Sequence, residues 1–293
     1  NSTTSGGTTV LGDTEIGLNI TGENLTKAGA GTLTLKGNNT YTGVTQINNG
    51  VIRVLSNTAL GSTAGGTVAS GGAVRLENNV TVSGEALTIV GSTAGGTNNA
   101  GLVNFSGNNV WTGGITLDVS NGQNTRINMT DGTLDIQGNI LIDSGATGTT
   151  TVGLVLTGNG GTGKISGNIS GLGNSQTLIK NGNSTWELTG TNTYAGTTRV
   201  DAGVLIASSI ANNLGSPAAG NSAIHLGEAT GTGTLRYTGT GETTTRGLYL
   251  RSNEAANAGG GVIEQSGTGA LVISGGVTSN TTNSDKTLTL QGS

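Results

Sequence analysis

LTKAGAGTLTLKGNNTYTGVTQINNGVIRVLSNTALG, residues 25–61, returns later in the chain as LIKNGNSTWELTGTNTYAGTTRVDAGVLIASSIANNLG, residues 178–215. The two stretches share a lysine, several glycines and an Asn-Thr-Tyr triplet in the same order. One extra residue precedes the final Leu-Gly pair of the second copy. So many identities in a fixed order indicate an internal repeat, and a repeat sets the architecture of the whole chain.

Two weaker copies lie between and after the full ones. GNNVWTGGITL, residues 107–117, aligns with part of the first copy, and GTGALVISG, residues 267–275, aligns with another part. The repeat units are therefore placed at residues 25–61, 101–117, 178–215 and 267–275. Their marker residues are Gly37, Tyr41, Gly43, Gly107, Trp111, Gly113, Gly190, Tyr194 and Gly196. The units lie 70 to 85 residues apart, which predicts three or four coils for each unit.

The composition favours a β structure with a thin core. Of the 293 residues, 56 are Gly, one is Pro and 2% are aromatic, which is too few large side chains for a compact globular core. Disorder is the competing interpretation, but disordered chains are usually rich in charge and poor in β-branched residues. Only 10% of this chain is charged, and Thr, Val and Ile are abundant. We therefore expect ordered strands.

Short alternating segments predict strands with one apolar face. Thr32-Leu33-Thr34-Leu35 alternates strictly, and in 51–54 Ile52 and Val54 point to one side while Arg53 points to the other. No window shows a helical stripe, so almost no helix is expected. The segment 208–222, which holds the single proline, is expected to be a loop.

The repeat favours a solenoid over a β-sandwich, because strand-sized units return in the same order. Stacking such units places Leu, Ile and Val inside, Asn in the turns and Thr outside. Coils of roughly 20–24 residues give about 12–14 coils, and about 60 Å of length at ~4.8 Å a coil. The sequence predicts one continuous all-β solenoid over residues 1–293, without separate globular domains.

The repeat resembles a known family. The pattern L-x-K-x-G-x-G-T-L-x-L-x-G-x-N-x-Y-x-G, followed by T-x-(I/V)-x-x-G-x-(L/I), is similar to the autotransporter-associated β-strand repeat of bacterial surface and secreted proteins. This resemblance implies a right-handed parallel β-helix outside a bacterial cell, with Gram-negative export. It implies no catalytic residue.

Candidate chemistry is sparse. His225, the only histidine, alternates with Ile224 and Leu226 and is expected to be an exposed strand residue. The densest group of acids is Asp118, Asp131, Asp135 and Asp143. Paired carboxylates can hydrolyse glycosides or, with more oxygens, bind Ca²⁺. However, Asp135 lies between Leu134 and Ile136, as an ordinary outward residue would. The aromatic markers are several coils apart, so we expect packing positions rather than a sugar-binding row.

Some partners are not expected. The 12 Lys and Arg residues are scattered, and the net charge is −4, so the basic patch that nucleic acid requires is missing. No apolar run reaches the ~18–20 residues of a membrane helix, and direct membrane insertion is not expected. GGTGKISGN, residues 160–168, has Lys164 where a Ca²⁺-binding nonapeptide needs an acid. No cofactor or metal is predicted.

Three functions remain open. The first is a rigid extracellular stalk or adhesin segment, with no enzymatic activity and with an unidentified surface ligand. The second is a subunit of an extracellular filament, because the ends of a solenoid expose unpaired backbone. Its partner is another copy or a flanking segment of a longer chain, and strand-like residues at Val10-Leu11 and at 288–290 favour such stacking. The third is a solenoid that binds or degrades polysaccharide.

Overall fold

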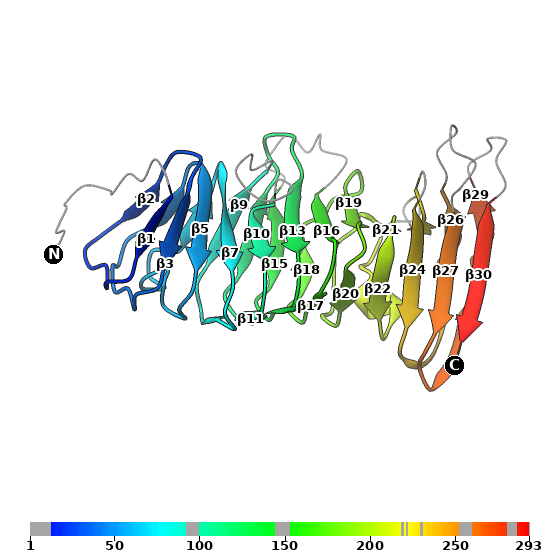
Figure 1. The fold of residues 1–293 in the computed structure, drawn as a ribbon. Coiled ribbons are helices and arrows are strands. Elements are labelled where there is room, and N and C mark those ends of the chain that lie inside the picture. The colour runs from blue at the N-terminus through cyan, green and yellow to red at the C-terminus, as the bar shows by residue number, and fades with distance from the viewer. Residues whose placement is uncertain are drawn as a thin grey trace.

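A computed structural model describes residues 13–91, 100–143, 153–217, 220, 222–228, 231–251, 260–279 and 286–292. The chain winds into an elongated stack of parallel strands, from β1 at one end to β30 at the other (Figure 1). Every pairing between the described strands is parallel. The predicted all-β solenoid is confirmed, and the predicted strand at Val10-Leu11 lies outside the described residues.

The largest sheet, called the large sheet below, holds 12 strands in chain order. They are β1 (Thr14–Ile16), β3 (Thr32–Leu35), β5 (Gly50–Val54), β7 (Gly72–Leu76), β10 (Leu102–Asn104), β13 (Thr125–Met129), β16 (Leu154–Gly158), β19 (Thr177–Lys180), β21 (Thr197–Val200), β23 (Ile224–Leu226), β26 (Leu248–Leu250) and β29 (Val277–Ser279). Each pass of the chain adds one strand, so 12 strands correspond to 12 passes and to about 50 Å at ~4.8 Å a strand.

The other sides of the solenoid are shorter. A nine-stranded sheet contains β8 (Thr81–Val82), β11 (Asn108–Trp111), β14 (Thr133–Ile136), β17 (Thr162–Ile165), β20 (Thr185–Leu188), β22 (Gly203–Ala207), β24 (Thr232–Tyr237), β27 (Gly260–Gln265) and β30 (Thr287–Gly292). A seven-stranded sheet contains β2 (Leu25–Lys27), β4 (Thr45–Ile47), β6 (Thr67–Ala69), β9 (Leu87–Val90), β12 (Ile115–Asp118), β15 (Ile140–Asp143) and β18 (Ile169–Ser170). Two strands, β25 (Thr240–Thr244) and β28 (Gly269–Ile273), form a separate sheet. The three larger sheets therefore occur together only in the middle of the stack.

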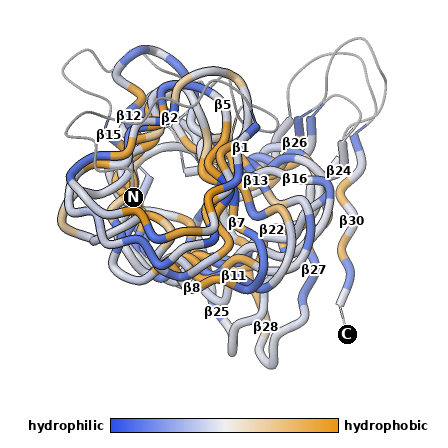
Figure 2. Tube along the Cα trace, turned by 60° about the vertical axis from the view of Figure 1, so that its left-hand side comes forward, coloured by the Kyte–Doolittle hydropathy of each residue, from blue (hydrophilic) through white to orange (hydrophobic). Residues whose placement is uncertain are grey.

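Equivalent side chains stack in ladders through the core. In the large sheet, the inward residues of successive strands are in register and buried: Leu33, Ile52, Val74, Leu102, Ile127, Leu156, Lys180, Val200, Leu226 and Leu250. Figure 2 shows the turns around a common axis, with hydrophobic segments recurring along the stack. Each ladder removes apolar surface from water at about 25 cal/mol per Å², and only neighbouring turns complete that burial.

The two full copies of the repeat lie on different sides of the solenoid. The first copy, β2 to β5, alternates between the seven-stranded and the large sheet. The second copy, β19 to β22, alternates between the large and the nine-stranded sheet. Because the chain passes from the large to the nine-stranded and then to the seven-stranded sheet, the second copy is displaced by one side.

One corner of the solenoid requires glycine. A Cβ on Gly65 would lie 2.1 Å from the carbonyl oxygen of Gly43, and one on Gly113 would lie 1.9 Å from that of Glu85. The same contact recurs in the following turns at Gly138, Gly167 and Gly190, and each of these glycines lies against a backbone carbonyl of the turn before it. Gly43 and Gly113 hold the same position of the repeat, whereas Gly190 corresponds to Gly37. This difference follows from the one-side displacement of the second copy.

A short helix corrects one prediction. α1 (Ile210–Asn213) lies in the segment 208–222 that the sequence predicts as a loop. The hydroxyl of Ser209 accepts a hydrogen bond from the Asn212 amide at 3.2 Å. The carboxylate of Glu242 accepts from the amides of Ile210 and Ala211, both at 2.8 Å. Caps of this kind satisfy helix donors that have no partner within the helix. No helix among the described residues is long and apolar enough to cross a membrane.

Candidate functional site

The four predicted acids do not converge on one point. Asp118 on β12 and Asp143 on β15 are paired in register on the seven-stranded sheet. Asp135 lies on β14 of the nine-stranded sheet, in register with Lys164, and Asp131 lies in the turn before β14. Among the described residues, no group of three or more His, Cys, Asp or Glu side chains could hold a metal ion. The structure therefore separates these acids into different surfaces.

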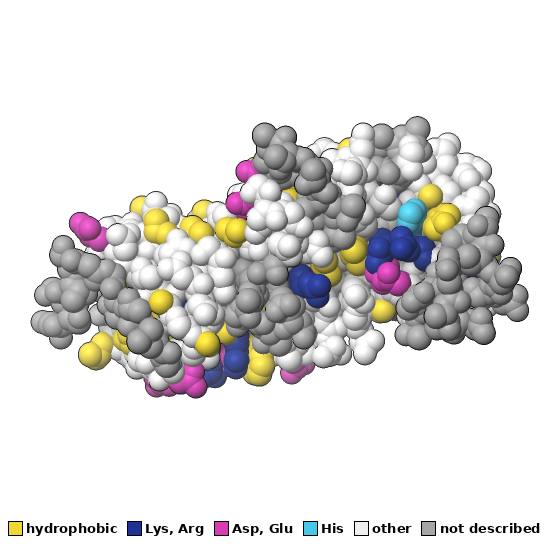
Figure 3. Space-filling view, turned by 90° about the horizontal axis from the view of Figure 1, so that it is seen from above, with side chains coloured by type: hydrophobic (Ala, Val, Ile, Leu, Met, Phe, Trp, Pro, Cys, Tyr) yellow, Lys and Arg dark blue, Asp and Glu magenta, His cyan; other side chains and the backbone are white. Residues whose placement is uncertain are grey.

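His225 points outward as predicted but is half-buried instead of exposed. Its ring lies 4.8 Å from that of Tyr249, its neighbour in register on the next strand. Burial and the charges of Arg251, Arg199 and Arg246 lower the pKa of His225 to about 4. The histidine is therefore neutral at physiological pH. In Figure 3 it lies beside a group of basic side chains on one face of the molecule.

Arg199 organises the acidic side of this group. Its guanidinium donates to both oxygens of Asp201, at 2.5 and 2.6 Å, and to Glu228 at 2.6 Å. Asp201 is only 2% exposed, and burial raises its pKa to about 6 against the opposing effect of Arg199. The three side chains neutralise one another in part, which leaves a compact mixed-charge surface around His225.

The aromatic markers are core residues, as predicted. Tyr41, Trp111 and Tyr194 are at most 1% exposed. The Tyr41 hydroxyl lies 2.5 Å from that of Thr45, and the Tyr194 hydroxyl lies 2.8 Å from that of Thr198. Each threonine also donates to the carbonyl of the leucine one turn later, at 3.3 and 3.1 Å. Trp111 has no such hydroxyl, and it lies within strand β11 instead of an irregular segment.

The repeat lysines occupy inward positions of core ladders, and they are buried although lysine normally carries a charge. Lys27 and Lys180 are 0% exposed. The Lys180 ammonium donates to the carbonyls of Asn181, Gly182 and Ala202, at 2.9, 2.7 and 2.9 Å. Lys27 makes the equivalent bonds to Ala28, Gly29 and Asn49. Burial lowers the pKa of both lysines, to about 7 for Lys180, where Asp201 opposes the effect. The shared residues of the repeat thus fasten consecutive turns together.

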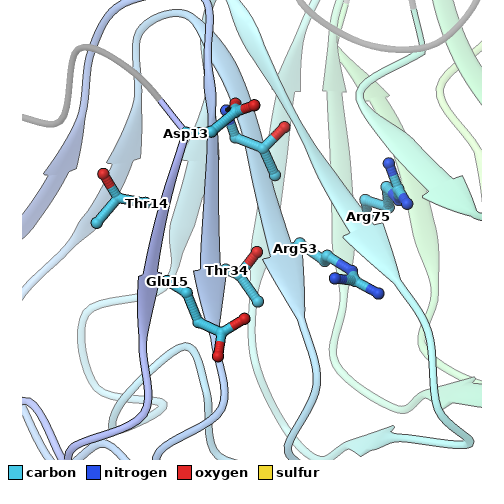
Figure 4. Close-up of a pocket in the computed structure, with 7 residues that line it drawn as sticks. Asp13, Thr14, Glu15, Thr34, Arg53 and Arg75 are labelled. Atoms are coloured by element: carbon cyan, nitrogen blue, oxygen red, sulfur yellow. Dashed lines mark hydrogen bonds between the residues drawn. The ribbon is translucent and has the colours of Figure 1, made fainter.

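The outer face of the large sheet carries a hollow at its N-terminal end. A depression of about 400 Å³ is lined by Asp13, Thr14, Glu15, Thr32, Thr34, Arg53 and Arg75. Figure 4 shows these side chains projecting from adjacent strands, with the two arginines on one side and the acids on the other. Glu15, Thr34, Arg53 and Arg75 are in register across β1, β3, β5 and β7. These four side chains form a row because each one occupies an outward position of its strand and the strands are paired in register.

Glu77 fixes the basic side of this hollow. Its carboxylate accepts two bonds from Arg53, at 2.8 and 2.6 Å, and one from Arg75 at 2.5 Å. Burial alone would raise the pKa of Glu77, but the two arginines hold it below its ordinary value. The Arg75 guanidinium also lies 3.6 Å from the centre of the Phe105 ring, a stabilising cation–π contact. Both guanidinium groups are therefore held in place before any ligand arrives.

The hollow can bind but shows no catalytic arrangement. It offers guanidinium donors, two carboxylates and hydroxyl groups, which suit a polar ligand with charges of both signs. The sequence predicted only that Arg53 faces outward. Arg75 could have been found with it, because it lies 22 residues later in the same phase of an alternating strand. The position of Glu77 between them depends on the turn that follows β7.

Both full copies match a family model. Residues 25–54 and 178–207 match the Passenger-associated-transport-repeat. The resemblance drawn from the repeat pattern is confirmed, and these two segments are passenger-type β-repeats of autotransporters.

One curated relative covers most of the chain. A protein named Adhesin BmaC autotransporter, from Brucella suis biovar 1 (strain 1330), is 33% identical over 272 residues. The match covers 92% of this chain but 6% of that protein, so the chain spans a small part of its relative's length. No solved structure matches the chain.

Proposed function

We propose that this chain, which carries two passenger-type repeats, is a rigid extracellular segment of a bacterial surface protein, and that the charged hollow at the N-terminal end of its large sheet is adhesive. Similarity to an autotransporter adhesin favours a surface location and a role without catalysis. The observation that carries the proposal is the continuous register of the large sheet, from β1 to β29.

Rigidity follows from how the turns are joined. Each turn contributes strands to two or three ladders, so bending at one place breaks several hydrogen-bonded pairings at once. The lysine and threonine hydrogen bonds of the repeat join consecutive turns in addition. A rod built in this way holds one end at a fixed distance from the other, which is what a stalk requires.

The adhesive role rests on the charged hollow. Arg53 and Arg75 are held by the buried Glu77, and their side chains are 33% and 23% exposed. Groups that are fixed before binding lose little conformational entropy when a ligand is bound. We therefore assign the hollow to contact with a polar surface ligand. The remainder of the rod would hold this hollow away from the bacterial surface.

Electron microscopy of the purified chain tests the rod. We expect straight particles about 50 Å long. Collapsed or flexible particles would exclude the stalk and the adhesin alike.

Bead adhesion tests the hollow. Beads coated with the chain are counted on epithelial monolayers, and the double variant R53A/R75A is compared with R126A, which removes an outward arginine on β13. We expect the double variant to lose most retention and R126A to keep it. If the unaltered chain shows no retention, the adhesive role fails and the stalk alone is supported.

A filament formed by end-to-end contact between copies is the second candidate, and two exposed apolar side chains on inward ladders favour it. Val277 on β29 continues the ladder of Leu248 and is 54% exposed, and Leu290 on β30 is 72% exposed. Leu290 continues the inward ladder of Ile263, so another strand stacked on it would bury it. Sedimentation over a concentration series tests assembly: L290E should abolish it, and a chain that stays monomeric at every concentration would exclude filaments formed through this end.

A further inference from the structure

Glu85 occupies an unusual position in the glycine corner. The turns before and after it place Gly65 and Gly113 at this corner. Glu85 precedes β9, directly after β8, which is the first strand of the nine-stranded sheet. It therefore lies at the joint where the first repeat, with two sheets, meets the part of the solenoid with three.

The Glu85 carboxyl is buried with little compensation. The residue is 2% exposed, and its Oε1 accepts a hydrogen bond from the Thr67 hydroxyl at 2.7 Å. Its Oε2 is buried and has no hydrogen-bond partner. An ionised carboxylate in such a place is strongly destabilised, so the group gains by keeping its proton.

No cation approaches this carboxyl among the described residues. It lines a cavity of about 170 Å³ between the segment 57–63 and β8, and every other polar side chain there is an amide or a hydroxyl. From the first repeat, the titratable group that interacts with it is the Tyr41 phenol, whose pKa is raised chiefly by burial. From β6, the Thr67 hydroxyl donates to it. Burial raises the pKa of Glu85 to about 7, against the bond from Thr67.

We propose that Glu85 is a proton-controlled joint: the neutral carboxylic acid keeps the turn at residues 57–67 closed against β8 and β9, and ionisation of the acid opens that turn.

The direction of the pH effect follows from linkage. Below pH 4.5, the ordinary pKa of Glu, the acid is neutral in the closed and open states alike, and pH has no effect. Between 4.5 and about 7 the open state releases its proton while the closed state keeps it. The closed turn is therefore progressively destabilised as pH rises, by a factor on the order of 100 in its opening equilibrium.

Hydrogen exchange tests the joint locally. The amide of Thr67 donates to the carbonyl of Ala86 at 2.8 Å and reports directly on the contact between these turns. Exchange is compared at pH 5 and pH 8 after correction for the intrinsic rate, with the strands β13 and β14 as an internal reference. In the unaltered chain, protection of Thr67 should fall on the order of 100-fold relative to the reference. In E85Q, which cannot ionise, protection should be the same at both values.

A control variant and a direct titration of the Glu85 carboxyl accompany the exchange measurement. The variant E187Q removes a carboxyl from the outer face of β20 and should behave as the unaltered chain does. The carbon-13 signal of the Glu85 carboxyl, assigned by its loss in E85Q, should titrate with a midpoint near 7. A midpoint near 4.5, or equal pH dependence in the unaltered chain and in E85Q, would overturn the proposal.

Discussion

The ammonium nitrogen of Lys180 lies 2.9 Å from the carbonyl oxygen of Ala202, which belongs to the next turn. The same lysine donates to two carbonyls of its own turn, so one buried side chain closes a corner and joins it to its neighbour. Lys27 makes the corresponding contacts in the first repeat. A lysine in an aliphatic ladder is thus explained by the turns beside it.

Replacing Lys180 by Met should destabilise the second repeat. Methionine fills a similar volume but leaves three carbonyls without their donor, and each lost bond costs about 1 kcal/mol. We expect a loss of about 2–4 kcal/mol in the free energy of unfolding, measured by urea denaturation. K164M, which alters a half-buried lysine on β17, serves as the control. Equal stability of K180M and the unaltered chain would show that the carbonyl contacts contribute nothing.

Replacing Tyr194 by Phe should have a smaller effect. The change removes the buried hydroxyl that lies 2.8 Å from the Thr198 hydroxyl but keeps the ring in the core. Thr198 retains its bond to Leu214, so only one interaction is lost. We expect a loss of about 1–2 kcal/mol by thermal or urea unfolding. A change as large as that of Y194A would mean that the hydroxyl, and not the packing of the ring, holds the corner.

Adding a methyl group at the glycine corner should be severe. In G113A the new Cβ would lie 1.9 Å from the carbonyl oxygen of Glu85, and backbone cannot move aside cheaply. We expect a loss of more than about 3 kcal/mol, or failure to fold. G17A is the matched control, because nothing lies within 4 Å of its Cβ. Circular dichroism melts of both variants compare them directly, and similar melts would contradict the stacking of this corner.

Acid should destabilise the region of His225. Its pKa is about 4 in the folded chain and 6.5 ordinarily, so the unfolded chain binds the proton first as pH falls. Stability is therefore present above pH 6.5 and is lost progressively between 6.5 and about 4. Unfolding of the unaltered chain and of H225Q is compared across this range, because carboxyl titrations are common to both. A constant difference between the two curves would show that His225 keeps its ordinary pKa.

Much of the fold could be predicted from local patterns. Alternation placed Leu33 and Leu35 inside and Arg53 outside, because the side chains of a strand point to opposite faces in turn. Alternation failed at β10, where Leu102, Val103 and Asn104 are all buried. Alternation also predicted an exposed His225, but this residue is half-buried because the ring of Tyr249 covers it from the next strand.

The candidate site was harder to predict. Arg53 and Arg75 are 22 residues apart, and only the register of β5 and β7 makes them neighbours. Glu77 joins them because the chain turns after β7, which alternation does not describe. The lysines were visible as shared residues of the repeat, but their burial was not, because a charged side chain normally faces water.

The sequence by itself determined the repeat, the short strands and the apolar ladders, because these depend on which residues alternate and recur. Only the tertiary structure decided on which side each copy lies. Turns between the copies differ in length and in number of strands, so the equivalent strands β3 and β20 occupy the large and the nine-stranded sheet respectively. That displacement depends on how every intervening turn closes, which no local pattern of residues describes.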